Sequence, residues 1–167
     1  YSYRRQISVA AAQSVSVPVS YTVDLDITGT DIYTKSLPSG NDVRVAYWNG
    51  SNWQELDRTL MVFESNRVYL RFRTQTSISA GGTDNNYYLY YGNPSAGSPP
   101  SDLSKVYQFY DDFSGTLSRW TDINGWTIQN GLAAAPGSVA GTRLYVTEPL
   151  AANGIYASGS GAHTLYY

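Results

Sequence analysis

Paired carboxylates are the side chains in this sequence whose type and spacing best suit catalysis. Asp24 and Asp26 lie two residues apart in an alternating segment, so on a strand they share one face about 7 Å apart. Asp111 and Asp112 are adjacent in a later segment. Glycoside hydrolysis uses two carboxyl groups about 5 to 10 Å apart, one protonated and one ionised. Solvated strand faces carry such pairs without any catalytic role, so we expect no catalytic residue here.

Other catalytic and metal-binding patterns are weaker still. The single histidine, His163, lies in GSGAHTLYY, where nothing positions a serine as its partner nucleophile. The sequence has no cysteine, which excludes disulfides, thiolate catalysis and zinc-thiolate sites. Loop capping accounts for Asp111 and Asp112 better than calcium binding, because no Asp-rich loop accompanies them. Arg71 and Arg73 fit a solvated strand face better than an anion site. We therefore expect no enzyme, no metal and no cofactor.

Aromatic side chains offer a different kind of site. Trp48 and Trp53 flank an Asn-Gly turn, and Tyr88 and Tyr90 share one face of the segment YYLYY. Such rings can stack on the faces of sugar rings, which makes these four residues the candidate ligand site. The alternative is structural: cross-strand packing for the tryptophans, and a core strand for the tyrosines.

The Asn-Gly turn also carries a modification signal. Asn49-Gly50-Ser51 is an acceptor pattern for N-glycosylation in a secreted protein. A tight hairpin turn explains the same residues equally well.

Composition restricts the class of protein. Among 167 residues the net charge is -2 and Lys plus Arg number only 11, so a broad basic face for nucleic acid is not expected. Charged residues make up 14%, against a usual ~25%, and tyrosine and small polar residues fill their place. This balance favours an extracellular or cell-surface protein. No apolar run approaches the ~20 residues that a membrane-spanning helix needs.

Period-2 alternation dominates the chain and predicts strands. The odd positions of residues 15–27 are apolar, with Pro18 as an expected kink or edge. Residues 43–47 lead into the tryptophan hairpin, and residues 67–73 alternate between apolar and charged positions. Residues 87–91 carry large side chains on both faces, which predicts a central strand covered on both sides.

A change in composition near residue 100 predicts a boundary. The segment NPSAGSPPSD contains three prolines and little to bury. We therefore predict an all-β protein: an antiparallel, jelly-roll-like β-sandwich over residues 1–100, followed by residues 101–167. This second segment is either a partial β domain or a C-terminal extension of the same sandwich.

Several motifs carry a family resemblance. The order YSYRRQISV, NDVRVAYWNGSNWQEL, VYLRFRT and NNYYLYYGNPSAGSPPSD resembles the domain-of-unknown-function family 2341 over about residues 1–108. The resemblance implies a β-sandwich-like module of large secreted and cell-surface proteins. The following FYDDFSGTLSRWT and GWTIQNG are similar to the opening strands of a concanavalin A-like, laminin-G-type module, of which about 60 residues are present.

The function expected from these observations is that of a non-enzymatic, extracellular structural or adhesive module. Its partners would be further copies of the chain or neighbouring domains of a larger surface protein. As a filament subunit it would assemble by β-strand addition, with YSYRRQISV or the C-terminal GAHTLYY as the donated strand. The alternative is a carbohydrate-binding module with a glycan as its ligand.

Overall fold

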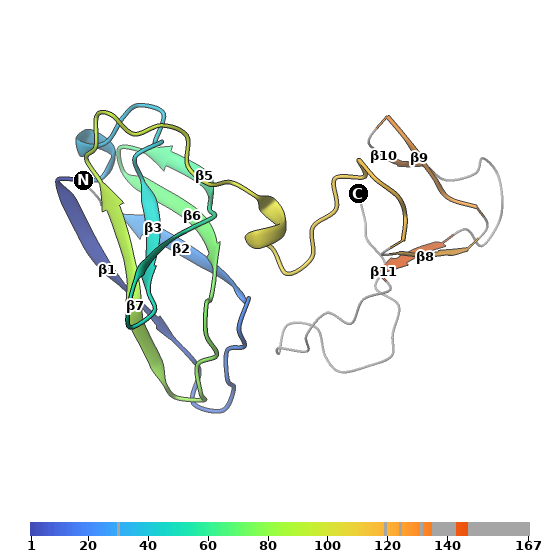
Figure 1. The fold of residues 1–167 in the computed structure, drawn as a ribbon, viewed down its shortest axis with the longest axis horizontal. Helices are drawn as coiled ribbons and strands as arrows, with labels where there is room; N and C mark the ends of the chain where they lie inside the picture. The colour runs from blue at the N-terminus through green and yellow to red at the C-terminus, as the bar shows by residue number, and fades with distance from the viewer. Residues whose placement is uncertain (30, 119, 124, 131, 135–142, 147–167) are drawn as a thin grey trace. The chain divides into compact units, whose positions relative to one another are not determined.

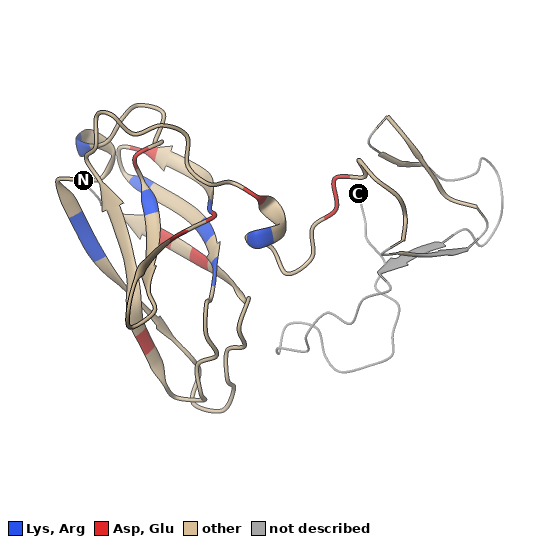
Figure 2. Cartoon of the chain, viewed as in Figure 1, with Lys and Arg blue, Asp and Glu red and all other residues tan. Residues whose placement is uncertain are grey.

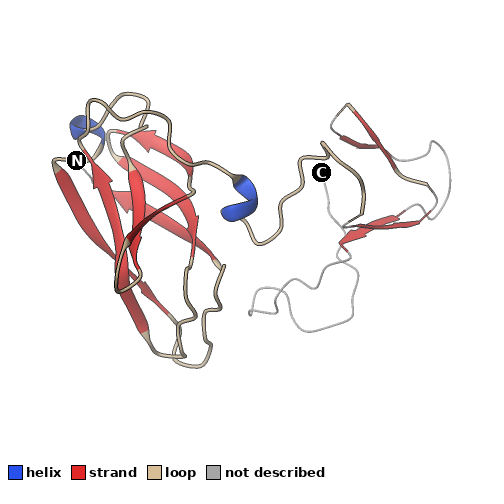
Figure 3. Cartoon of the chain, in the orientation of Figure 1, coloured by secondary structure: helices blue, strands red, loops and turns tan. Residues whose placement is uncertain are grey.

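The computed structural model describes residues 1–29, 31–118, 120–123, 125–130, 132–134 and 143–146. In these residues strands are joined by turns and by two short 3-10 helices, Tyr33–Lys35 (η1) and Leu103–Lys105 (η2) (Figures 1 and 3). The chain divides into two compact units, Tyr1–Gln108 and Phe109–Tyr167. None of the described helices has the length and apolar character required to span a membrane.

The first unit is an antiparallel β-sandwich, as predicted, with a four-stranded sheet and a three-stranded sheet. In the larger sheet the order is β1-β7-β3-β4, so β7 lies between β1 and β3 (Figure 1). In the smaller sheet it is β2-β6-β5. The strands are β1 (Tyr3–Ala10), β2 (Thr22–Thr28), β3 (Arg44–Trp48), β4 (Trp53–Leu56), β5 (Thr59–Glu64), β6 (Arg67–Arg73) and β7 (Thr83–Tyr91).

The core lies between the two sheets and follows the period of two. On β6, Val68, Leu70 and Phe72 are fully buried, while the residues between them face outward and are half-buried. Tyr87 and Leu89 of β7 are buried against them from the other sheet. The alternation predicted for residues 67–73 is therefore confirmed, because each strand turns every second side chain inward.

β7 is central, as predicted, but it is not covered on both faces. Tyr87, Leu89 and Tyr91 point into the core, whereas Tyr88 and Tyr90 remain half-buried on the outer face. The three-stranded sheet packs on only one face of the four-stranded sheet. The prediction of burial on both sides was wrong, and the outer tyrosines stay partly accessible.

The long strand predicted over residues 15–27 is shorter than expected. β2 begins only at Thr22, and the preceding segment makes one isolated bridge, between Val17 and Ile78. Pro18 has no N–H to donate, and Ser20 has a φ of 65°, which breaks the extended backbone. Val19 is consequently 55% exposed. Within β2 the predicted alternation is confirmed.

Residues 100–108 belong to the first unit and pack on its β-sandwich. The backbone N–H of Arg58 donates to the Pro100 carbonyl, and the N–H of Asp102 donates to the Asp57 carboxylate. The Thr22 hydroxyl donates to the Val106 carbonyl at 2.9 Å. These bonds place the proline-rich segment on the surface of the sandwich.

In the described residues of the second unit, short antiparallel strands form two pairs. β8 (Trp120–Ile123) pairs with β11 (Arg143–Val146), and β9 (Thr127–Gln129) pairs with β10 (Leu132–Ala134). Trp120 is buried, and its ring lies 5.2 Å from that of Phe109 and 5.5 Å from that of Phe113.

Candidate functional site

An aromatic patch lies on the outer face of the four-stranded sheet. It consists of Trp48 on β3, Trp53 on β4, and Tyr88 and Tyr90 on β7. The hairpin between β3 and β4 places Trp48 directly opposite Trp53, and the antiparallel register places Ala46 opposite Tyr88. Residues directly opposite in a sheet point to the same face. The structure thus brings the four predicted ligand-site residues together.

The rings of the patch contact one another. Trp53 has its ring centroid 5.2 Å from that of Trp48, 5.2 Å from that of Tyr88 and 6.0 Å from that of Tyr90. Tyr1 extends the array, with its ring 5.9 Å from Tyr90. The contacts with both tyrosines are edge-to-face, an arrangement that aromatic pairs favour. Cross-strand packing of Trp48 and Trp53 is therefore confirmed.

Packing does not bury the patch. Trp53 remains 46% exposed although three rings surround it. Ala46 occupies the sheet position between β4 and β7, and its small side chain leaves room for the Trp53 ring to reach across to Tyr88. Arg4 on β1 lies over the Tyr88 ring at 5.4 Å. The accessible stacking surface is therefore provided mainly by Trp53.

The turn beside the patch is fixed by Asn49. Its side-chain oxygen accepts hydrogen bonds from the backbone N–H groups of Ser51 at 2.9 Å and Asn52 at 2.8 Å. Gly50 has a φ of +95°, which a residue with a side chain rarely adopts. The candidate glycosylation residue Asn49 is exposed at the tip of this turn.

A shallow pocket opens beside the patch. It has a volume of about 260 Å³ and is lined by Trp48, Trp53, Asn86 and Tyr88. Asn86 was not among the predicted site residues. The signal for it was the Asn-Asn pair in TDNNYY, which interrupts an otherwise aromatic strand.

Asp24 and Asp26, the carboxylates considered for catalysis, each form an ion pair with an arginine of β6 on the three-stranded sheet. Asp24 accepts hydrogen bonds from the Tyr69 hydroxyl and from Arg71, both at 2.6 Å. Burial opposes ionisation of Asp24, but these two bonds outweigh it, and the pKa of Asp24 is lowered. A hydrogen bond from Arg67 lowers the pKa of Asp26 in the same way. Both groups are thus kept ionised, whereas a general acid needs a raised pKa.

On the three-stranded sheet, arginines of β6 neutralise aspartates of the neighbouring strand β2. Figure 2 shows blue bands on β6 facing red bands on β2. Arg71 pairs with Asp24, while Arg73 donates to the backbone carbonyls of Ser20 and Ser104. Neither arginine is left to bind an anion, which favours the interpretation of a solvated face.

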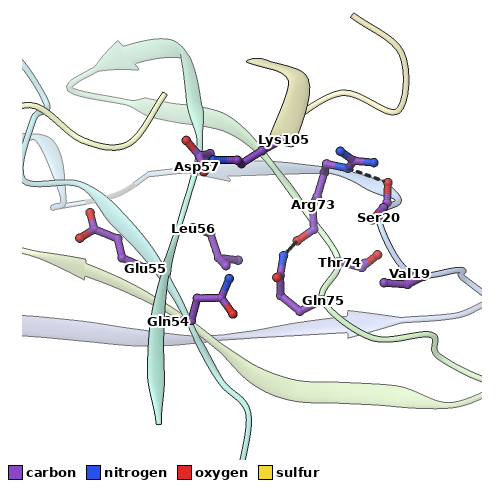
Figure 4. Close-up of a pocket in the computed structure, with 10 residues that line it drawn as sticks. All are labelled: Val19, Ser20, Gln54, Glu55, Leu56, Asp57, Arg73, Thr74, Gln75 and Lys105. Carbon is purple, nitrogen blue, oxygen red and sulfur yellow. Dashed lines mark hydrogen bonds and ion pairs between the residues drawn. The ribbon is translucent and has the colours of Figure 1, made fainter. Parts of the chain in front are cut away.

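A second cavity, of about 180 Å³, lies where β4 faces the end of β6 (Figure 4). Its polar groups are engaged with one another: Gln75 donates to the Arg73 carbonyl, and Lys105 lies 3.9 Å from Asp57. The cavity therefore has few free groups for a ligand. It is lined by Val19, Ser20, Gln54, Glu55, Leu56, Asp57, Arg73, Thr74, Gln75 and Lys105.

The acidic pair of the second unit caps loops. The Asp111 carboxylate accepts from the Phe113 N–H at 2.8 Å and from the Trp120 indole N–H at 2.7 Å. Asp112 accepts from the Ser114 N–H at 3.0 Å. Across the part of the chain that the structure describes, no three His, Cys, Asp or Glu side chains gather as metal ligands would. His163 lies outside the described residues.

The N-terminal segment considered as a donated strand is β1, and it pairs with β7 of its own chain. The register runs from Tyr3 opposite Tyr91 to Ala10 opposite Thr83. To be donated to another copy, β1 would have to leave β7 of its own chain and pair with β7 of the other copy. The other candidate strand, residues 161–167, lies outside the described residues.

Comparison with known families gives a match over the middle of the chain. The family model described as "Domain of unknown function (DUF2341)" matches residues 39–129. This range contains the tryptophan hairpin, β6, β7 and the Gly-Asn-Pro turn, and it continues into the second unit. No curated protein and no solved structure matches the chain.

Proposed function

We propose that this chain, which belongs to the DUF2341 family, is a non-enzymatic adhesive module of an extracellular or cell-surface protein and that it binds carbohydrate through its aromatic patch. The β-sandwich holds the patch on a rigid sheet. In this proposal the second unit is the beginning of a concanavalin A-like module, which the motif FYDDFSGTLSRWT supports.

The observation that carries the proposal is the exposure of Trp53 within a cluster of rings. Full burial of a large apolar side chain contributes about 1.5 to 3 kcal/mol, and Trp53, which is 46% exposed, forgoes part of that free energy. Clustered apolar exposure of this kind marks interaction sites, whereas single exposed residues need no explanation. Trp53 has Trp48, Tyr88 and Tyr90 around it, so its ring is held in place before a ligand arrives. Preorganisation of this sort reduces the entropy lost on binding.

Glycan binding by Trp53→Ala tests the proposal. The wild-type chain should bind at least one immobilised oligosaccharide on a glycan array, and the variant should lose that binding. Tyr33→Ala is the matched control, because Tyr33 is also exposed and also contacts a second ring, that of Phe63, but lies outside the patch. Glycan binding that survives Trp53→Ala together with Trp48→Ala would exclude the patch as the site.

A hydrolase assay tests the non-enzymatic part of the proposal. We expect no release of reducing sugar from a polysaccharide panel, because Asp24 and Asp26 are held ionised by Arg71 and Arg67. Release that is abolished by Asp24→Asn or Asp111→Asn would contradict the proposal.

A second candidate function, a structural subunit that self-associates by β-strand addition, is favoured by a groove on the side of the sandwich. The groove has a volume of about 370 Å³ and lies between β1 and β2, the edge strands of the two sheets. Edge strands present unpaired backbone groups to which a further strand can bond. Apolar residues that line the groove are Ile7, Val9, Val17, Val23 and Leu25.

Electron microscopy separates the two candidate functions. Filaments would support the structural subunit, and monomers that bind glycan would support the adhesive module.

A further inference from the structure

The pocket beside the aromatic patch is shaped by a β-bulge in β7. Ile7 pairs with Tyr87 and Val9 pairs with Asp84, so the single residue Ser8 lies opposite both Asn85 and Asn86. An extra residue in one strand changes the alternation of faces, and such bulges often re-aim a side chain at a functional site. Asn85 bonds to Ser8 while Asn86 lines the pocket with Tyr88. The bulge thus lets two consecutive asparagines point to the outer face.

A buried carboxylate holds the bulge. Asp84, only 8% exposed, accepts from the backbone N–H of Asn86 at 3.0 Å and from its side-chain amide nitrogen at 2.8 Å, both through Oδ1. Its Oδ2 accepts from the Thr76 hydroxyl at 3.1 Å. Asn85 is fixed separately, because its side-chain oxygen accepts from the Ser8 hydroxyl at 2.6 Å.

These contacts orient the Asn86 amide. The side-chain nitrogen of Asn86 is the donor to Asp84, so the NH2 group of Asn86 faces Asp84. The amide carbonyl oxygen on the other side of the group is therefore turned away from Asp84 and is available as an acceptor at the pocket. An acceptor next to an exposed indole ring suits a ligand that has an apolar face and hydroxyl donors at its edge.

We propose that this pocket binds a single neutral pyranose ring, stacked on Trp53, with one of its hydroxyl groups donating to the Asn86 carbonyl oxygen. This inference rests on the proposed function and specifies its ligand. Trp48, Trp53, Asn86 and Tyr88 line the pocket, and none of them is charged. Arg4 lies over the Tyr88 ring but is not among the lining residues, so the lining itself offers no charged partner to the carboxylate of an acidic sugar. The volume of about 260 Å³ is below the ~300 Å³ at which drug-sized sites begin, which suits contact with one sugar ring.

Binding of defined oligosaccharides to the whole chain tests the inference. The probes are neutral gluco-, manno- and galacto-oligosaccharides and, for comparison, oligogalacturonates, with affinity measured by isothermal titration calorimetry. At least one neutral series should bind and the oligogalacturonates should not. Asn86→Ala should weaken binding about tenfold, the effect of one lost hydrogen bond. The control is Asn85→Ala, which alters the same bulge but removes a side chain that bonds to Ser8 and does not line the pocket. The affinity of this variant for the oligosaccharide should stay within about twofold of the wild-type value.

The outcomes separate this inference from the proposed function. If no oligosaccharide binds, the proposed function fails and the inference fails with it. If binding depends on Trp53 but favours oligogalacturonates, or is unchanged by Asn86→Ala, only the inference is overturned. Equal losses in the Asn85 and Asn86 variants would also overturn it, because they would show that the bulge acts only as a structural support for the patch.

Discussion

The carboxylate of Asp42 accepts a hydrogen bond at 2.8 Å from the backbone N–H of Gly92, 50 residues further along the chain. The same carboxylate accepts from the N–H groups of Leu37 at 2.8 Å and Asn93 at 3.1 Å. Asp42 is fully buried. It joins the start of β3 to the turn that ends β7, and so connects the segment DVRV with the segment YYGNP. This bond network fixes the strands that carry the aromatic patch.

We predict that Asp42→Asn lowers the free energy of unfolding by about 3 kcal/mol. The amide nitrogen would face at least one backbone N–H that now donates to a carboxylate, and hydrogen bonds to charged groups contribute about 1.5 to 3 kcal/mol each. Urea denaturation measures the change. Asp102→Asn is the control, because the Asp102 carboxylate also accepts from a backbone N–H, that of Ser104, but is exposed. This variant should lower the free energy of unfolding by less than about 1 kcal/mol. Similar losses in the two variants would contradict the role of Asp42.

Gly92 itself tolerates no side chain. Its φ is +76°, and a Cβ at this position would lie 2.6 Å from Cδ2 of Tyr3. Gly92→Ala should therefore lower the free energy of unfolding by about 2 kcal/mol or more, through backbone strain and the clash together. Adding Tyr3→Ala should recover the part due to the clash. Gly97→Ala, with open space and no positive φ, should be nearly neutral. Because Tyr3→Ala also removes the stacking of Tyr3 on Tyr91, the single Tyr3→Ala variant completes the cycle. A coupling free energy near zero would then assign the whole cost of Gly92→Ala to the backbone.

Tyr87 should make the protein sensitive to alkali. Burial raises the pKa of Tyr87 from 10.0 to about 12, and its hydroxyl oxygen accepts from the Gln75 N–H at 2.8 Å. Because the folded-state pKa exceeds the unfolded value, the stabilisation is complete below pH 10 and is lost as the pH rises from 10 to 12. Denaturation midpoints measured across that range should fall more steeply for the wild type than for Tyr87→Phe. Parallel curves for the two proteins would exclude this assignment.

The sequence predicted the parts of the fold in which alternation alone decides the structure. Residues 67–73 form β6 as expected, and Trp48 and Trp53 pair across the predicted hairpin. Alternation does not reveal how many layers cover a sheet, so residues 87–91 were predicted to be covered on both faces, although Tyr88 and Tyr90 remain partly accessible. It also does not reveal a bulge, because the displacement of Asn86 depends on Asp84 and on the partner strand β1. The sequence therefore predicted the aromatic residues of the candidate site but not its polar residue, Asn86.

β1 should be replaceable by a peptide added in trans. It is an edge strand that contacts the rest of its sheet through β7 alone, and its inward residues Ile7 and Val9 are 7% and 8% exposed. A chain that begins at residue 11 should lose stability, because β7 then has an unpaired edge and the core has an open side. The peptide YSYRRQISVA should bind this truncated chain and restore its melting temperature, since it regains the ladder of backbone bonds and the buried side chains.

The control for this complementation is the same peptide with Ile7→Asp and Val9→Asp, which retains the backbone but places charges in the core. Calorimetry should detect binding of the native peptide only. Binding in trans is the elementary step by which one copy would complete the sheet of another, so success would make filament growth through β1 a feasible mechanism. A truncated chain that keeps the native melting temperature, or that binds both peptides equally, would show that β1 does not complete the sandwich by strand pairing and would remove it as a donated strand.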